Sequence, residues 1–460
     1  MPQELDQILI SYNQPEFMER LVNVFLSKGG MSHFGVGPGH VENRRKVEAI
    51  LSEVVEKEDE AIVKYTEKFD GVKLTPEQFR VSQDDLKKAH EQIDLELLCS
   101  IRKSIDNVKK YQKEIFIGNN KKCSGGTGIK YTAIKRVGIC VPGASAPLPS
   151  TVIMTAVPAT VAGVEEIAVV SPPRYKGDVH PVTLAVCYEL SIDEDYQNCQ
   201  IEVYRIGGAQ AVAALCFETE TIKRVDKIVG PGNQWVQTAK QLVFGDVGID
   251  SIAGPSEVLI IANDDANPAW VAADMLSQAE HAPGCAYLFT VSRKIAERVL
   301  KELKKQIGQL KRKEETIACL KKSSGVVVFE DMYDLIQRAN EFAAEHLQIQ
   351  CGQQSREIAA KIEDAGAIFI GDYSPVAVGD YWAGPSHTLP TGISAKFFSA
   401  LSSNDFIKST SIIEYDKEKL AASAEHIIRL AEAEGLDAHA KSIKIRQEDQ
   451  GKDPRIQTKD

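Results

Sequence analysis

The stretch Ile134-Lys135-Arg136-Val137-Gly138-Ile139-Cys140-Val141 opens the part of the chain that decides its fold. Its β-branched residues predict a strand, and the turn residues Pro142-Gly143 follow it directly. Between residues 131 and 254, short runs of this kind alternate with helical segments. Such alternation predicts a parallel sheet whose strands are joined by right-handed crossovers.

The apolar runs of this region define its expected elements. We expect strands at residues 134–141, 167–170, 201–206 and 227–229. We expect helices near residues 151–163, 180–190 and 208–217. A parallel sheet binds ligands in the crevice beyond the carboxyl ends of its strands, so the turns that follow the strands are candidate binding segments.

Glycine-rich turns follow three of these strands, at Val141-Pro142-Gly143-Ala144-Ser145-Ala146-Pro147, Gly207-Gly208-Ala209-Gln210 and Gly230-Pro231-Gly232-Asn233. None matches the G-x-G-x-x-G dinucleotide fingerprint or a P-loop. Taken singly, each is typical of a tight turn. Because all three are expected at the carboxyl edge of one sheet, a nucleotide-sized pocket is the alternative.

A second α/β unit is expected after Ala253-Gly254-Pro255-Ser256, with strands at residues 257–262, 287–291, 326–329, 347–349 and 367–370. A helix expected from Asp331 to Glu345-His346 precedes the fourth strand. An adjacent acid and imidazole at that junction suit general acid–base chemistry. The alternative is a histidine that complements the dipole at the helix C-terminus.

A helix of the same unit is expected to begin at Asn267-Pro268 and to end at Pro283-Gly284. Asn is a preferred N-cap and Pro suits the first helical position. This spacing predicts that Gln278 and His281 share one face of the last helical turn. A polar helix end exposed to solvent is the alternative. Further on, polar and aromatic residues between glycines and prolines at residues 379–391 predict a binding loop.

The outer parts of the chain carry weaker patterns. Amphipathic helices are expected at residues 41–70 and around 84–117, and the segment 121–128 breaks the second one near a plausible domain boundary. A helix is expected at residues 417–433. Residues 447–460 are charged and lack a hydrophobic pattern, so we expect them to be disordered.

Composition bounds the class of protein. A chain of 460 residues is expected to form at least two domains, and 43% hydrophobic and 26% charged residues are ordinary for a globular protein. No membrane span or signal peptide is expected, which predicts a cytoplasmic location. The net charge of −11 argues against binding to nucleic acid or anionic lipid. Nine scattered cysteines without a C-x-x-C pair predict reduced core thiols.

Four stretches together resemble one family, the histidinol dehydrogenases. They are residues 141–152, residues 254–281, Glu345-His346-Leu347 with residues 379–391, and residues 434–439. The resemblance extends over roughly residues 135–446. It implies a zinc-dependent homodimer that oxidises L-histidinol to L-histidine with two molecules of NAD, through an aldehyde that stays bound.

The resemblance also implies roles for single residues. The family's zinc ligands fall on Gln278, His281, Asp380 and His439, and its general base falls on His346, with Glu345 activating water. Its substrate contacts fall on the four zinc ligands and His346, together with Ser256, His387 and Glu434. His439 and Glu434 are expected to reach the partner subunit's site. The cofactor contacts fall on Cys140, Gln210 and Asn233.

This sequence departs from the family pattern at a few positions. Cys140 stands where the family usually has a tyrosine before Val-Pro-Gly, which removes one ring-sized contact to NAD. Ala144 stands where a second glycine is common, and Ser386 where asparagine is common. The segment between Pro173 and Gly207 is longer than usual, as expected for an enlarged turn and helix.

The expected fold class is therefore α/β, with two incomplete Rossmann-like parallel-sheet domains and small helical segments at both ends that help dimerise. The expected boundaries are an N-terminal helical segment at 1–40, a zinc and substrate domain at 41–135 and 255–400, an NAD-binding domain at 136–254, a C-terminal dimerisation segment at 401–446 and a disordered tail at 447–460.

Three other functions remain to be weighed against this one. A paralogue could oxidise another small alcohol or diol with the same zinc and NAD, although Glu434 and His387 match the positions that hold the amino alcohol. A zinc hydrolase could use Glu345 and the metal to activate water. A nucleotide-binding regulatory protein with an incidental metal is the non-catalytic alternative.

Overall fold

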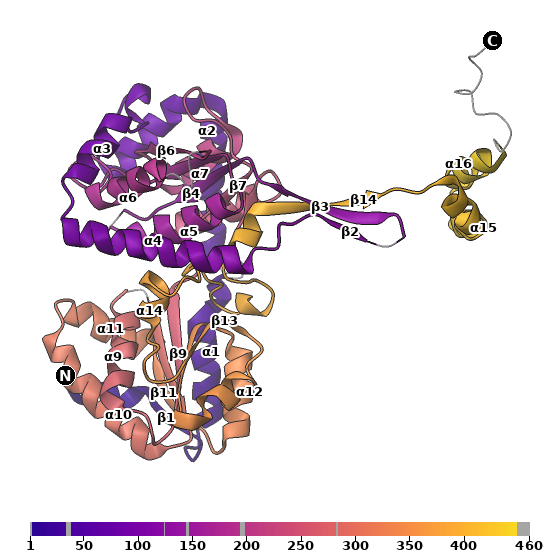
Figure 1. The fold of residues 1–460 in the computed structure, drawn as a ribbon. Helices are drawn as coiled ribbons and strands as arrows, with labels where there is room; N and C mark the ends of the chain where they lie inside the picture. Colours follow the sequence, from indigo (N-terminus) through magenta and orange to yellow (C-terminus); the bar gives the residue numbers. More distant parts are fainter. Residues whose placement is uncertain are drawn as a thin grey trace, which may run out of the picture. The chain divides into compact units, whose positions relative to one another are not determined.

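The computed structural model describes residues 2–33, 38–123, 125–143, 147–193, 198–281 and 284–448. Ala144, Pro283 and the part of the expected tail from residue 449 onward lie outside the described residues. The chain divides into two compact units, one formed by Met1–Ile117 and Ala133–Ile407 and the other by Gly118–Thr132 and Lys408–Asp460. The first unit contains two parallel sheets flanked by helices, so the predicted α/β class is confirmed (Figure 1).

The five-stranded sheet of the first unit corresponds to the region predicted to alternate. All of its pairings are parallel, in the order β6-β5-β4-β7-β8. Its strands are β4 (Arg136–Cys140), β5 (Glu166–Val170), β6 (Gln200–Tyr204), β7 (Lys227–Val229) and β8 (Gly248–Ile249). The connecting helices are α5 (Pro149–Val161), α6 (Pro181–Ile192), α7 (Gly208–Phe217) and α8 (Gln234–Val243).

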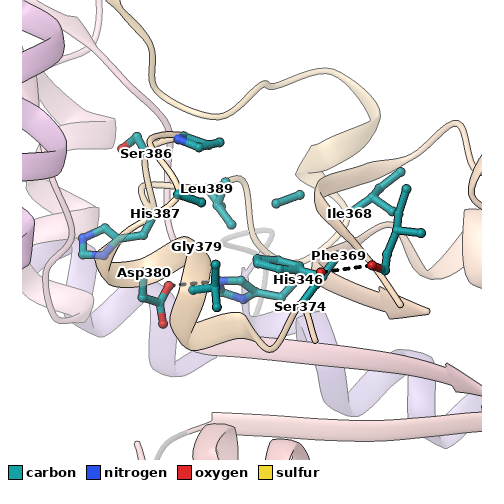
Figure 2. Close-up of a pocket in the computed structure, with 14 residues that line it drawn as sticks. His346, Ile368, Phe369, Ser374, Gly379, Asp380, Ser386, His387 and Leu389 are labelled. Carbon is teal, nitrogen blue, oxygen red and sulfur yellow. Dashed lines mark hydrogen bonds and ion pairs between the residues drawn. The ribbon is translucent and has the colours of Figure 1, made fainter. Parts of the chain in front are cut away.

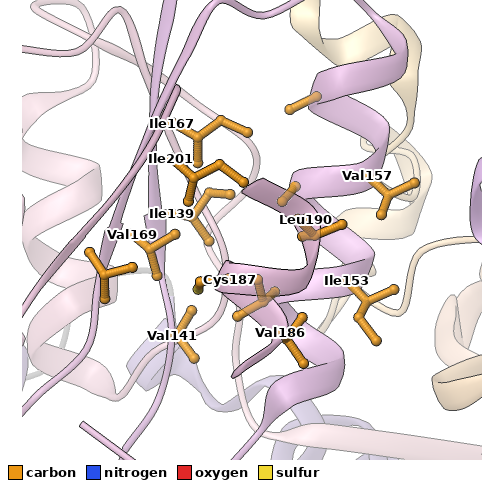
Figure 3. Close-up of a cluster of buried hydrophobic side chains, with 14 of the residues drawn as sticks. Ile139, Val141, Ile153, Val157, Ile167, Val169, Val186, Cys187, Leu190 and Ile201 are labelled. Carbon is orange, nitrogen blue, oxygen red and sulfur yellow. The ribbon is translucent and has the colours of Figure 1, made fainter. Parts of the chain in front are cut away.

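Both faces of this sheet are covered, because neighbouring residues along a strand enter different apolar clusters. On one face, Ile139 and Val169 pack with side chains of α5 and α6 in the cluster shown in Figure 3. Cys140 and Val170 pack on the other face with α7 and α8. Strands buried on both faces need apolar residues at nearly every position, which is why they appear in the sequence as continuous apolar runs.

The six-stranded sheet is also parallel throughout, in the order β1-β11-β10-β9-β12-β13. Its strands are β1 (Leu9–Ser11), β9 (Ser256–Ala262), β10 (Gly284–Thr290), β11 (Gly325–Val328), β12 (Ala344–Gln350) and β13 (Ala365–Ile370). Its helices are α1 (Phe17–His33), α9 (Pro268–Ala279), α10 (Arg293–Gln306), α11 (Lys313–Ser323), α12 (Met332–Phe342), α13 (Ser355–Ala359) and α14 (Val376–Tyr381).

The expected helix from Asp331 to His346 is shorter than the sequence suggested. Asp331 caps it by accepting a hydrogen bond from Asp334 N, but the helix ends at Phe342 and Ala343 is left-handed, with φ of 48°. Glu345 and His346 instead begin β12, which is paired on both sides with β9 and β13. Backbone pairing on two sides outweighs the weak local preference for helix.

The remaining helices of the first unit also differ from expectation. The second amphipathic segment is two helices, α3 (Gln83–Glu91) and α4 (Leu95–Ile115), because Asp94 caps a new start by accepting from Glu96 N and Leu97 N. The helix α2 (Pro38–Asp70) is interrupted at Glu58, where φ is 47°. α4 ends at Ile115, ahead of the segment 121–128, and the first stretch of the first unit ends at Ile117.

The second unit is small. Its strands are β2 (Lys121–Cys123), β3 (Thr127–Ala133) and β14 (Ile407–Ile413), and its helices are α15 (Lys417–Ala433) and α16 (Asp437–Glu448). β2 and β3 pair antiparallel. The three strands form a sheet in the order β14-β3-β2.

Two global features bear on the class of protein. Among the described residues, none of the helices combines the length and apolar character that crossing a lipid bilayer requires. The nine cysteines are free thiols, and seven of them are buried, as expected for core residues.

Candidate active site

His346 is the centre of the site on the six-stranded sheet. It is 3% exposed, and its Nδ1 lies 3.0 Å from the carbonyl oxygen of Glu257 on the neighbouring strand. That contact assigns the proton to Nδ1, because a carbonyl oxygen only accepts. Nε2 is buried without a hydrogen-bond partner.

Glu345 lies beside His346 at the start of β12. Its Oε2 accepts hydrogen bonds from Ser256 Oγ (2.9 Å) and from the backbone N–H of Glu257 (2.7 Å), and it lies 3.4 Å from His346 Nδ1. Ser256 is the first residue of β9. The acid, the imidazole and this serine therefore meet at the amino ends of β9 and β12, opposite to the edge at which parallel sheets usually bind ligands.

The predicted binding loop brings Asp380 to His346. Asp380 belongs to α14, and its Oδ1 lies 3.6 Å from His346 Nε2 (Figure 2). Gly379 precedes it, and a Cβ there would lie 2.7 Å from the ring of Phe369, so the close approach of α14 to β13 requires glycine. His387 follows on the same loop. A cavity of about 330 Å³ is lined by His346, Phe369, Ser374, Gly379, Asp380, Ser386, His387 and Leu389, with apolar neighbours.

Gln278 and His281 flank the end of α9. The N-cap prediction is confirmed, since Asn267 accepts a hydrogen bond from Ala269 N and Pro268 is the first helical residue. The helix ends at Ala279, however, and His281 lies in the turn beyond it, with its N–H 3.3 Å from the carbonyl of Gln278. Gln278 is 2% exposed whereas His281 is exposed, so the two do not share a buried helical face.

The charges of the site are coupled. Burial lowers the pKa of His346, but the negative charges of Glu345 and Asp380 outweigh burial and hold it well above its ordinary value. Burial raises the pKa of Asp380, and His346, followed by His387 and His281, brings it below its ordinary value. Burial lowers the pKa of His387. Asp380 therefore interacts with three histidines, including His281 from the turn after α9.

The three glycine-rich turns line one cavity of about 710 Å³ at the carboxyl edge of the five-stranded sheet. They belong to the ends of β4, β6 and β7, as the sequence predicted. Close packing explains some of the glycines. At Gly230, φ is 104° and a Cβ would lie 2.4 Å from the carbonyl oxygen of Cys140. At Gly232 a Cβ would lie 2.5 Å from the side chain of Val236.

All three expected cofactor residues line this cavity. Gln210 is buried at the start of α7, and neither its amide nitrogen nor its amide oxygen has a hydrogen-bond partner. Asn233 caps α8 by accepting from Trp235 N and Val236 N. Cys140 is buried at the end of β4, and burial raises its pKa to about 12, so it is a neutral thiol. Aromatic residues of other elements also reach the cavity, namely Tyr65, Phe69 and Trp235.

Comparison with known proteins identifies the family. The model of the family described as histidinol dehydrogenase matches residues 39–447. The chain belongs to the histidinol dehydrogenase family. Curated histidinol dehydrogenases from Rhodopirellula baltica and Oceanobacillus iheyensis are each 45% identical over 87% of this chain, which covers 86% and 92% of their own lengths.

The fold agrees with that assignment. The crystal structure of histidinol dehydrogenase from Elizabethkingia anophelis matches with a TM-score of 0.83 and 33% identity, over 96% of this chain and 98% of that chain. The resemblance recognised in the sequence is confirmed. The protein is accordingly an oxidoreductase of histidine biosynthesis.

Three further residues that the resemblance singled out are Glu434, His439 and Ser386. Glu434 ends α15 and His439 lies in the first turn of α16, so both belong to the second unit, and both are exposed. Ser386 is buried, and its Oγ donates to the carbonyl of Met154 (2.8 Å) while accepting from Thr388 N (3.1 Å). Its hydroxyl is thus engaged by the backbone.

Within the described ranges, no three His, Cys, Asp or Glu side chains lie close enough together to hold a metal ion. In the first unit, the family pattern assigns three residues to the metal. His281 and Asp380 are a histidine and an acid, whereas Gln278 is an amide. Gln278 is almost fully buried, and its amide nitrogen lacks a hydrogen-bond partner; a ligand role would fall to its amide oxygen.

Sequence reasoning missed Glu257 and Phe369. The Glu257 carbonyl fixes the His346 ring, and its carboxylate accepts from Gly392 N (2.9 Å), which ties the binding loop to β9. Phe369 lies 6.0 Å from the His346 ring. A fully buried acid in an otherwise apolar strand was the available signal for Glu257. Nothing in the sequence distinguished Phe369 from an ordinary core residue.

Proposed function

We propose that the protein oxidises L-histidinol to L-histidine in two NAD-linked steps through L-histidinal, with zinc at the substrate site. The observation that carries this proposal is His346, a buried imidazole whose Nδ1 is held by a carbonyl and whose unpartnered Nε2 lines a cavity. Membership of the histidinol dehydrogenase family indicates the substrate, L-histidinol. The two cavities supply separate places for the substrate and the dinucleotide.

His346 is proposed as the base of both steps. Removing hydride from an alcohol requires that the hydroxyl proton leave as well, and Nε2 is positioned to accept it. Glu345 then stabilises the resulting imidazolium, because its carboxylate raises the pKa of His346. The second oxidation requires addition of water to the aldehyde. Glu345, held by Ser256 and the Glu257 backbone, is proposed to promote that step.

Zinc is proposed to be held by Gln278, His281 and Asp380, with His439 of the partner subunit. Amide oxygen, imidazole and carboxylate are donors that zinc accepts. When bound, the ion would act as a template that fixes the imidazole and amine of the substrate. Ser256, His387 and Glu434 of the partner subunit are proposed to complete the contacts to the substrate.

NAD is proposed to occupy the 710 Å³ cavity of the five-stranded sheet, and when bound it would supply the hydride acceptor. Gln210 and Asn233 are the proposed polar contacts. The orphaned amide of Gln210 supports this, since a buried amide without a partner is expensive unless a ligand satisfies it. Cys140 is too short to supply the ring contact of the usual tyrosine, and Tyr65, Phe69 and Trp235 are the rings that line the cavity instead.

One assay tests the proposal. Purified protein incubated with L-histidinol and NAD is expected to form two NADH per substrate, and to lose activity after chelation and regain it with Zn²⁺. His281→Asn is expected to lower zinc content and activity together. A paralogue would prefer another alcohol or diol, and a zinc hydrolase would turn over without NAD. No NADH from L-histidinol at any zinc level would contradict the proposal.

A further inference from the structure

One face of β12 is polar along most of its length. His346, Gln348 and Gln350 alternate with Leu347 and Ile349, and all five are buried. Leu347 and Ile349 enter the apolar cluster on one side of the sheet. A parallel strand covered on both faces ordinarily carries apolar residues on both. The polar face, which continues from His346, is therefore not explained by packing alone.

The two glutamines of this face converge on one carboxylate of α9. Oδ2 of Asp274 accepts hydrogen bonds from Nε2 of Gln348 (2.9 Å) and from Nε2 of Gln350 (2.7 Å). Nε2 of Gln348 also lies 3.4 Å from the carbonyl oxygen of Ser374, which lines the His346 cavity. Both glutamines are only 1% exposed, so solvent does not compete for these bonds.

Asp274 connects the helix and the strand that carry the two parts of the site. It lies one helical turn before Gln278 on α9, and residues four apart share a helix face. Gln348 lies two residues after His346 on β12, and residues two apart share a strand face. The contact between Asp274 and Gln348 therefore joins the helix that carries Gln278 to the strand that carries His346.

We propose that Asp274 is a positioning residue, which holds α9 against β12 through Gln348 and Gln350 and so fixes the position of Gln278 at the zinc site. This inference rests on the proposed zinc role of Gln278. Metal sites tolerate only about 0.2 Å of error in ligand distances. Changes to residues that orient ligands typically weaken metal binding by about 10- to 100-fold.

The test measures Zn²⁺ affinity by competition with a chromophoric chelator, using the full-length protein. Asp274→Glu keeps the charge but is one methylene longer, so it is expected to weaken zinc binding about 10- to 100-fold. Asp274→Asn keeps the length and one acceptor oxygen, so it is expected to stay within about threefold of wild type. The matched control is Gln306→Leu, which removes a different tether of α9, the 2.9 Å bond to the Ala269 carbonyl, and is expected to leave zinc affinity unchanged.

A triple variant separates positioning from folding. Asp274→Leu/Gln348→Leu/Gln350→Leu replaces the cluster by apolar groups, leaves only the Ser374 carbonyl without its 3.4 Å contact and is expected to fold. It is expected to bind zinc at least tenfold more weakly than wild type at unchanged stability. Wild-type zinc affinity in both Asp274→Glu and the triple variant would overturn the inference. A wild-type protein that binds no zinc would instead contradict the proposed function, so the two failures are distinguishable.

Discussion

At the scale of single residues, the chemistry depends on two neighbours in one strand. His346 has its Nε2 toward the cavity, while Glu345 is engaged by Ser256 and the Glu257 backbone. These environments differ although the two side chains lie 3.4 Å apart, because Glu345 Oε2 accepts hydrogen bonds whereas His346 Nε2 has no hydrogen-bond partner. This contrast supports the proposed division of labour, in which the imidazole moves the proton and the carboxylate serves the hydration of the aldehyde.

Two substitutions test this division. His346→Ala is expected to slow the oxidation of both L-histidinol and L-histidinal by about 10²- to 10⁴-fold, the usual loss for a positioned base. Glu345→Gln is expected to slow the aldehyde step more than the alcohol step. Single-turnover NADH formation from each substrate measures the two steps separately. Equal losses for Glu345→Gln on both substrates would contradict the assignment.

Asp274 gives a stability prediction that depends on pH. Burial raises its pKa, and the hydrogen bonds from Gln348 and Gln350 only partly offset this. A carboxyl group with a raised pKa in the folded state favours folding while it is protonated, and this contribution is lost as pH rises through the folded pKa. Asp274→Asn has no carboxyl group that ionises at this position, so it does not lose stability in this way as pH rises. The variant is therefore expected to gain stability relative to wild type between a pH below 3.8 and neutral pH.

Urea unfolding of both proteins across that pH range measures the difference. Asp364→Asn is a surface control, since Asp364 pairs with Lys396 at 3.1 Å and both side chains are partly exposed. It is expected to show less than about 1 kcal/mol of change. A constant difference between Asp274→Asn and wild type at every pH would show that Asp274 does not titrate in this way.

At the scale of elements, the third glycine-rich turn depends on a buried ion pair. Lys240 of α8 donates to the Gly230 carbonyl and pairs with Asp250, which in turn accepts from Gly230 N at 2.7 Å. Lys240 is fully buried. A buried charge is tolerated only when it is paired and hydrogen-bonded. The Lys240–Asp250 pair therefore fixes the backbone N–H and carbonyl of Gly230, and with them the turn that lines the 710 Å³ cavity.

Gly230→Ala tests the importance of that turn. Both the left-handed backbone and the contact with the Cys140 carbonyl oppose a Cβ, so the turn is expected to shift. KM for NAD is expected to rise about tenfold or more while zinc content stays constant. Gly245→Ala is the matched control, because φ there is 113° but a Cβ would meet nothing within 4 Å. It is expected to cost about 1–3 kcal/mol of strain without changing KM. A normal KM for NAD in Gly230→Ala would place the cofactor elsewhere.

At the scale of the whole molecule, the second unit has little core of its own. Within α15 and α16 the buried residues are Ala424, Ala431 and Ala440, whereas Leu430 is 67% and Ile445 is 55% exposed. Exposed apolar side chains on a small unit are typical of a surface that another chain covers. This supports the proposal that the unit is a dimerisation segment that delivers His439 to the partner subunit's site.

A mixing experiment tests the shared site. His439→Ala and His346→Ala proteins are each expected to be nearly inactive alone. If ligation crosses the interface, a heterodimer collects both lesions in one site and none in the other, so activity is expected to return to roughly half of wild type per heterodimer. If each chain supplies its own His439, every site carries one lesion. Heterodimers confirmed by sizing that stayed inactive would rule out the shared site.

The sequence by itself determined the α/β class, the strands of both parallel sheets except β1 and β8, and the three glycine-rich turns at one sheet edge. It did so because doubly buried strands require unbroken apolar runs, and tight turns at strand ends require glycine; both requirements are local. The family motifs, which are short stretches of sequence, also sufficed to recognise the histidinol dehydrogenases.

Only the tertiary structure decided where the chemistry lies within that frame. Glu345 and His346 are strand residues because they belong to β12, which β9 and β13 pair from both sides, and no local preference shows this. Gln348 and Gln350 look like ordinary polar residues until Asp274 of α9 is brought to them. Contacts between residues some 70 positions apart are set by how elements pack, and packing is a property of the whole fold.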